Sequence, residues 1–178
     1  LDRFDPEGYV RRGRLYASQK DYANAIADMD KAVELDTSNT FAYFNRAIMF
    51  YEQEKYKEAM DDLNRVLRDE PGNALTLYNR GLISAQMGAY EDALNDMDRV
   101  LDINPENVLA YFNRASIFIE MGQYKNALED YDKAIELYNA LDAKVKDFFM
   151  RSKLAAFSPD STAALDVRTA QIESISAD

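Results

Sequence analysis

Residues 40–73 read TFAYFNRAIMFYEQEKYKEAMDDLNRVLRDEPGN, and this stretch decides the fold. Apolar or small side chains recur in it twice at the i, i+4, i+7 spacing of one helical face: Tyr43, Ala47 and Phe50, then Ala59, Leu63 and Val66. Pro71 ends the second series, because proline lacks an amide donor and restricts the residue before it. The stretch therefore predicts two amphipathic helices joined by a short turn around Glu54 and Lys55.

The same pattern returns every 34 residues along the chain. Small residues recur at that spacing where two helices would cross, and tyrosines recur at the start of each second helix: Gly13, Ala47, Gly81 and Ala115, and Tyr22, Tyr56, Tyr90 and Tyr124. Several independent columns at one period indicate a tandem array of one structural unit. The expected units cover residues 6–39, 40–73, 74–107 and 108–141.

The unit Tyr43-x-x-x-Ala47-x-x-Phe50, followed by Tyr56-x-x-Ala59-x-x-x-Leu63-x-x-Val66 and Pro71, resembles the tetratricopeptide repeat. The other three units match nearly as well, with departures from the family pattern at Thr37, Leu77, Ser84 and Asn139. The resemblance implies an all-α fold: a right-handed superhelical solenoid of antiparallel helix pairs. It also implies a module that binds other proteins rather than an enzyme.

The repeat register fails after Leu141. Residues 142–157 still have a helical pattern, and a stacked array needs an end cap that covers the apolar face of its last unit. We therefore expect a capping helix over 142–157. Residues 158–178 form a C-terminal tail that contains either a further short helix or a frayed end.

The composition excludes several classes of protein. The 178-residue chain has no cysteine, histidine or tryptophan, and its 21 basic and 32 acidic residues give a net charge of −11. Without cysteine and histidine, a disulfide framework, a zinc finger or a serine–histidine catalytic triad cannot form. The acidic excess disfavours nucleic acid as a partner, and no apolar run approaches the ~20 residues that span a bilayer. We expect no catalysis, no cofactor, no metal ion, no nucleic acid and no membrane insertion.

One arginine and one aspartate recur in every unit, 16 residues apart. The columns are Arg12, Arg46, Arg80 and Arg114, and Asp28, Asp62, Asp96 and Asp130. The arginines could form a row that binds an anionic ligand, or each could pair with the aspartate on the antiparallel helix of its own unit. Because the two residue types always occur together, the sequence favours structural pairs.

The first helices of the later units carry a second apolar face. Phe41, Phe44, Ile48 and Tyr51 lie within about 80° of one another at 100° per residue, opposite the core face. An apolar face of this kind predicts a binding groove on the concave side of the array. The residues expected to contact a partner are Phe41, Phe44, Asn45, Ile48, Tyr51, Tyr78, Asn79, Leu82, Phe112 and Asn113. The alternative is that the C-terminal segment or a second copy of the chain fills this groove.

The asparagines test one known binding mode of the family, the carboxylate clamp that holds the acidic C-termini of heat-shock chaperones. In the register of the first three units, the clamp positions are Val10, Arg14, Asn45, Leu75 and Asn79, and only Asn45 matches the clamp pattern. Chaperone-tail binding through that clamp is therefore not expected. The basic edge around Arg14 could orient an acidic partner segment, or it could simply be a solvated N-terminal edge.

The sequence thus predicts a non-catalytic interaction module that binds a peptide or an amphipathic helix of a partner protein in an apolar groove and scaffolds a complex. A self-associating module, a homodimer or larger oligomer held by the groove or the tail, is the alternative. The composition leaves the compartment open between cytoplasm and periplasm. Because the sequence starts at Leu1 rather than at a methionine, we expect that a segment precedes it in the full protein.

Overall fold

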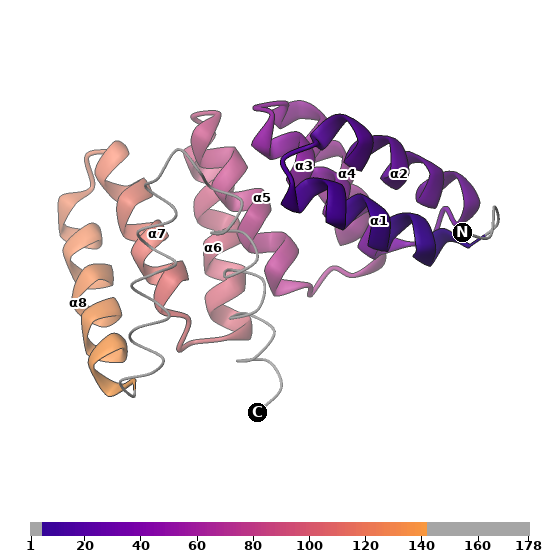
Figure 1. The fold of residues 1–178 in the computed structure, drawn as a ribbon. Helices are drawn as coiled ribbons and strands as arrows, with labels where there is room; N and C mark the ends of the chain where they lie inside the picture. The colour runs from indigo at the N-terminus through magenta and orange to yellow at the C-terminus, as the bar shows by residue number, and fades with distance from the viewer. Residues whose placement is uncertain (1–4, 142–178) are drawn as a thin grey trace. The chain divides into compact units, whose positions relative to one another are not determined.

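The computed structural model describes residues 5–141, and Figure 1 shows their helices. These residues form eight α-helices and no strand. The helices are α1 (Pro6–Ser18), α2 (Tyr22–Leu35), α3 (Thr40–Glu52), α4 (Tyr56–Asp69), α5 (Ala74–Gln86), α6 (Tyr90–Ile103), α7 (Val108–Glu120) and α8 (Tyr124–Ala140). The all-α prediction is confirmed. The expected capping helix over 142–157 and the tail over 158–178 lie outside the described residues.

Each repeat of the sequence forms one helix pair. Within the pairs, α1 packs on α2, α3 on α4, and α7 on α8, and the side chains of α5 and α6 are joined by hydrogen bonds. Neighbouring pairs also meet, because α2 packs on α3 and α6 packs on α7. The chain divides into two units, residues 1–76 and residues 77–178.

The turn between the two helices of a repeat requires a left-handed residue. Gly88 and Gly122 supply it in the third and fourth repeats, with φ of 76° and 72°. The residues at the same position in the first two repeats, Lys20 and Glu54, adopt φ of 60° and 59°. Residues other than glycine rarely adopt a positive φ. The first two turns therefore carry backbone strain that the glycine turns avoid.

The recurring asparagine before each later first helix is a helix N-cap. The side-chain oxygens of Asn39, Asn73 and Asn107 each accept a hydrogen bond, at 2.9 Å, from the backbone amide three residues later. Such a bond satisfies one of the amide donors that a helix start leaves without an intrahelical partner. This column therefore fixes where α3, α5 and α7 begin.

The small residues of the first helices allow the two helices of a repeat to approach closely. A Cβ built on Gly13 would lie 2.8 Å from Cε of Met29, and a Cβ on Gly81 would lie 2.9 Å from Cε of Met97. Both methionines are fully buried. Glycine is therefore required by the close packing in these two repeats, whereas Ala47 and Ala115 occupy the same position in the other two.

Candidate partner-binding surface

The arginine and aspartate that recur 16 residues apart form a bidentate ion pair in every repeat. Nε and Nη2 of Arg46 donate to the two carboxylate oxygens of Asp62 at 2.8 and 2.7 Å. The same geometry, with distances between 2.6 and 2.8 Å, joins three further pairs: Arg12 and Asp28, Arg80 and Asp96, and Arg114 and Asp130. The two parallel bonds of a guanidinium to a carboxylate are stronger and more directional than a single bond.

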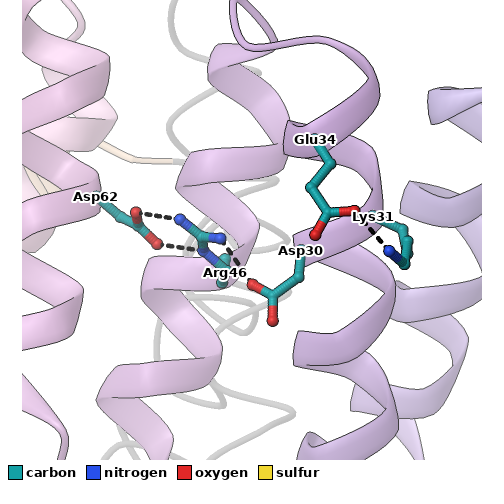
Figure 2. A network of polar contacts seen from close by, with 5 residues as sticks. All are labelled: Asp30, Lys31, Glu34, Arg46 and Asp62. Carbon is teal, nitrogen blue, oxygen red and sulfur yellow. Dashed lines mark hydrogen bonds and ion pairs between the residues drawn. The ribbon is translucent and has the colours of Figure 1, made fainter.

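Two of these arginines also join neighbouring repeats. Nη1 of Arg46 donates to Asp30 of the preceding repeat at 2.7 Å, and Nη1 of Arg114 donates to Asp98 at 2.6 Å. Figure 2 shows Arg46 between Asp62 and Asp30, with the exposed pair of Lys31 and Glu34 on the neighbouring turn. One guanidinium thus holds its own helix pair together and fixes the register of that pair on the one before it.

Aromatic rings cover the guanidinium of the same arginines. Arg46 lies 5.3 Å from the ring centroid of Tyr43 and 5.9 Å from that of Phe50, within the range of a cation–π contact. Burial raises the pKa of the Asp62 carboxyl, and the hydrogen bonds and charge of Arg46 oppose that rise. The hydrogen bonds to Asp62 are also the main reason that the pKa of Arg46 is raised.

The arginine column is therefore structural. Each carboxylate partner inside the repeat is buried, and each guanidinium is engaged by at least two hydrogen bonds. The interpretation of these residues as pairs within repeats is confirmed. The alternative, in which the four arginines form an unpaired row that binds an anionic ligand, is therefore wrong.

The residues expected to contact a partner in the second repeat lie on one side of α3. We call the side formed by Phe41, Phe44, Ile48 and Tyr51 the α3 face. Phe41 is 44% exposed, Tyr51 is half-buried, and Phe44 and Ile48 are buried at 9% and 6% exposure. The α3 face therefore offers a partner the ring of Phe41 and part of Tyr51, while Phe44 and Ile48 contribute mainly to packing.

The predicted contact residues of the third and fourth repeats lie on α5 and α7. Tyr78 and Asn79 are buried at 1% and 7% exposure, and Leu82, Phe112 and Asn113 are half-buried. Phe112 packs on the ring of Tyr131 with centroids 5.3 Å apart. Helix α7 also exposes Ile119, at 40%. Among the predicted residues of these two repeats, those of α7 and Leu82 offer more surface than Tyr78 and Asn79.

The predicted contact residues Asn45 and Asn113 have hydrogen-bond partners within the protein. The side-chain amide of Asn45 donates to the carbonyl oxygen of Phe41 at 2.7 Å, one turn earlier on the same helix. The side-chain amide of Asn113 donates to the hydroxyl of Tyr78 at 2.5 Å. The pattern of the sequence does not specify these side-chain rotamers, so it could not show that the amide donors are already used.

A basic residue that the list of predicted contacts does not include lies against the α3 face. The guanidinium of Arg14, on α1, lies 5.6 Å from the ring centroid of Phe41. Both side chains are exposed. The sequence predicts a basic edge around Arg14, but the pairing of this cation with one aromatic ring depends on how α1 and α3 meet.

Within the described residues, no group of three or more carboxylate, imidazole or thiolate side chains could hold a metal ion. Among the same residues, no helix is long and apolar enough to cross a membrane.

Family models of the tetratricopeptide repeat match the chain four times, over residues 6–39, 41–73, 74–107 and 108–139. Each match covers one helix pair of the structure. No protein of curated function matches the sequence of the chain at a significant level.

Solved structures of MamA have a similar fold. The crystal structure of MamA aligns with a TM-score of 0.74 and 24% sequence identity, covering 78% of this chain and 81% of that chain. Residues 41 to the end of MamA from Desulfovibrio magneticus RS-1 align with a TM-score of 0.75 and 24% identity, covering 79% of each chain. At this level of identity the likeness concerns the fold.

Proposed function

Because the chain belongs to the tetratricopeptide repeat family, a family of protein-interaction scaffolds that are generally not enzymes, we propose that it binds a segment of a partner protein along its first helices. The partner contributes an extended peptide or one face of an amphipathic helix, and apolar side chains anchor it. The protein then acts as a scaffold that brings this segment into a complex.

The observation that carries the proposal is the exposure of Phe41. A helix that is apolar on two sides is normally buried on both of them. On α3, however, Phe41 is 44% exposed while its neighbours Phe44 and Ile48 are buried. Large aromatic side chains in this position are frequent anchors of protein interfaces. The surface around Phe41 is therefore the first place where a partner side chain would gain by excluding water.

The charge beside Phe41 indicates the chemistry of the partner. Arg14 covers the ring of Phe41, and Arg11 lies on the same helix with only a long contact of 3.9 Å to Glu7. A partner segment with an aliphatic or aromatic anchor and an acidic residue beside it would satisfy both the ring and the cation. This pairing favours the acidic-partner hypothesis for the basic edge.

Selection of random displayed peptides on the full chain tests the proposal. We expect the selected peptides to combine an apolar anchor with acidic residues. Their affinity, measured by fluorescence polarisation, should fall at least about tenfold for Phe41→Glu, which places a carboxylate at the apolar contact. Arg14→Glu should weaken the peptides that carry an acidic residue and affect neutral peptides less.

The matched control is Met87→Glu, which adds the same charge at a methionine that is 53% exposed in the turn after α5. This variant should bind the selected peptides with the affinity of the unchanged chain. Equal binding to the Phe41→Glu and Met87→Glu variants would refute the proposed surface. Replacing Phe44 or Tyr78 is a poorer test, because both side chains are buried and their loss would open cavities.

Self-association is a second candidate function. It is favoured by the first and last helices of the described array, which expose apolar side chains at positions that are buried in the other repeats.

A further inference from the structure

Two positions of the repeat carry apolar residues that are buried in three repeats and exposed in the fourth, one position in the first repeat and the other in the last. On the second helices, Val33, Leu67 and Leu101 are 8%, 8% and 7% exposed, whereas Ile135 at the same position of α8 is 57% exposed. On the first helices, Met49, Ile83 and Ile117 are 4%, 1% and 3% exposed, whereas Leu15 of α1 is 59% exposed. Helices α8 and α1 thus each expose an apolar side chain at a position that is buried in the other repeats.

The two columns meet where one repeat stacks on the next. Val33 and Met49 belong to one buried cluster at the contact of α2 with α3. Helices α6 and α7, which carry Leu101 and Ile117, pack in the same way. Ile135 therefore has the position of a residue that the next repeat would cover, and Leu15 has the position of a residue that a preceding repeat would cover.

A charged column shows the same incompleteness. The ion pairs between repeats join Asp30 to Arg46 and Asp98 to Arg114. The residues at the corresponding positions of the two ends are Asp132 on α8 and Arg12 on α1. Asp132 is exposed, and the side chain of Arg12 is 41% exposed, against 16% for Arg46 and 21% for Arg114.

The hydrogen-bonding capacity of Arg12 matches this comparison. Its Nε and Nη2 bind Asp28, as in the other repeats, while the atom that corresponds to the donor of Arg46 to Asp30 is Nη1. Within residues 5–141, Arg12 has no second carboxylate partner, and the side-chain carboxylate of Asp132 has no ion pair or hydrogen bond. Each end therefore carries one half of an ion pair that the array forms twice internally.

We propose that copies of this chain associate head to tail, with α8 of one copy stacked on α1 of the next. In this contact Ile135 meets Leu15, and Asp132 reaches Nη1 of Arg12. On each helix the charged and the apolar residue are three positions apart and so lie on one side. The contact repeats the arrangement that α2 and α3 have within the chain, with Asp30 and Val33 on one helix and Arg46 and Met49 on the other.

The proposal has a definite consequence for assembly, because the two surfaces are different. Such a heterologous contact leaves one α8 surface and one α1 surface free in every open complex, so further copies can add until a ring closes. The apolar contact supplies most of the affinity, and the charged pair supplies the register and discriminates against wrong partners. This contact rests on the second candidate function, self-association, and lies apart from the α3 face, so its failure would leave the proposed partner binding at the α3 face untouched.

Analytical ultracentrifugation of the full chain tests the contact. Measurements at about 0.15 M salt shorten the range of the repulsion between acidic copies to about 8 Å. The average mass should rise above that of the monomer as the concentration approaches about 1 mM, the weak end of specific association. A chain that stays monomeric over this series, as it would if residues 142–178 cover α8, overturns the proposal.

Two variants that block one end each provide the sharper test. Leu15→Glu blocks the α1 surface, and Ile135→Glu blocks the α8 surface, so each variant alone should be monomeric. An equimolar mixture retains one intact surface of each kind and should form a one-to-one dimer. Persistent self-association of either single variant would show contact between like surfaces and would overturn the head-to-tail contact.

The charged pair is tested by Asp132→Arg, which should raise the dissociation constant at least about fivefold by placing two cations together. Asp102→Arg is the matched control, because it makes the same change at an exposed aspartate of α6, away from both end helices. The control should associate like the unchanged chain. An equal effect of both substitutions would show that net charge alone governs association and would contradict the register that we propose.

Discussion

Removal of Arg46 should be among the most destabilising single substitutions at a polar position of this protein. The side chain of Arg46 is 16% exposed, and that of its partner Asp62 is 8% exposed. Removing one partner of such a buried pair costs about 3–5 kcal/mol, because it leaves the other charge buried without compensation. The second carboxylate, on Asp30, is 48% exposed, so its bond to Arg46 contributes no more than about 1 kcal/mol.

The expected series follows from these exposures. Arg46→Gln should lower the free energy of unfolding by about 3–5 kcal/mol, and Asp30→Asn by less than about 1 kcal/mol. Arg46→Lys should fall between them, since lysine keeps the charge but cannot form the two parallel bonds to Asp62. Replacing both partners, as Arg46→Met with Asp62→Leu, should recover much of the loss because no buried charge remains.

The loss caused by Arg46→Gln should also depend on pH. Burial already raises the pKa of Asp62, and Arg46 opposes the rise. Without Arg46 the pKa of Asp62 in the folded state moves further above its value in the unfolded chain. The folded variant then binds a proton more tightly than the unfolded variant, so its stability deficit should shrink as the pH falls through the folded-state pKa of Asp62.

Urea unfolding followed by far-UV circular dichroism, at pH 7 and at about pH 5, measures both effects. A loss below about 1 kcal/mol at pH 7 for Arg46→Gln would refute the reasoning, because it would mean that water compensates Asp62 as it does an exposed carboxylate. A deficit that grows on acidification would contradict the assigned direction of the pKa.

Three further predictions concern the turns, a tyrosine and the helix crossing. Gly88→Ala should destabilise by about 1 kcal/mol through the backbone alone, because a Cβ at this left-handed residue meets no atom within 4 Å, whereas Glu54→Gly should relieve the equivalent strain. Both changes are measured by urea unfolding, and effects of the opposite sign would contradict the strain. Burial, with a smaller contribution from Glu52, raises the pKa of Tyr22 to about 12. The contribution of Tyr22 to the free energy of unfolding is therefore fully present below the tyrosine pKa of about 10 in the unfolded chain, and it should be lost as the pH rises toward 12. In an alkaline unfolding series, the Tyr22→Phe variant should lose less stability than the unchanged chain. Gly81→Ala should destabilise the unchanged chain, because the new Cβ would lie 2.9 Å from Cε of Met97, and it should cost less in a Met97→Leu background; additive effects would show that the methionine is not the obstacle.

The helices and the pairs within repeats could be predicted from the sequence because both depend on local spacing. Sixteen residues separate Arg46 from Asp62, and that separation spans a single turn of chain between two helices of known period. The pattern within one repeat does not predict the second carboxylate, Asp30, although it lies 16 residues before Arg46. Its role depends on how one repeat stacks on the previous one, and the recurrence of the same spacing between Asp98 and Arg114 is the signal that could have revealed it.

The contact residues were harder to assign because burial and binding require the same residue types. A phenylalanine packed between helices and a phenylalanine exposed for binding a partner protein produce the same periodicity. The sequence pattern therefore could not distinguish Phe44 from Phe41. The structure shows 9% exposure for the first and 44% for the second. Side-chain hydrogen bonds such as that of Asn45 to the carbonyl of Phe41 depend on rotamers and leave no trace in the spacing.

The measurement that tests the central claim most directly maps a selected peptide onto the isotopically labelled full chain by amide chemical-shift perturbation. The account predicts that the largest perturbations in residues 5–76 occur on α1 and α3, around Arg14, Phe41 and Tyr51. Perturbations concentrated on the exposed sides of α2 and α4, with α3 unaffected, would contradict the claim that the first helices bind the partner.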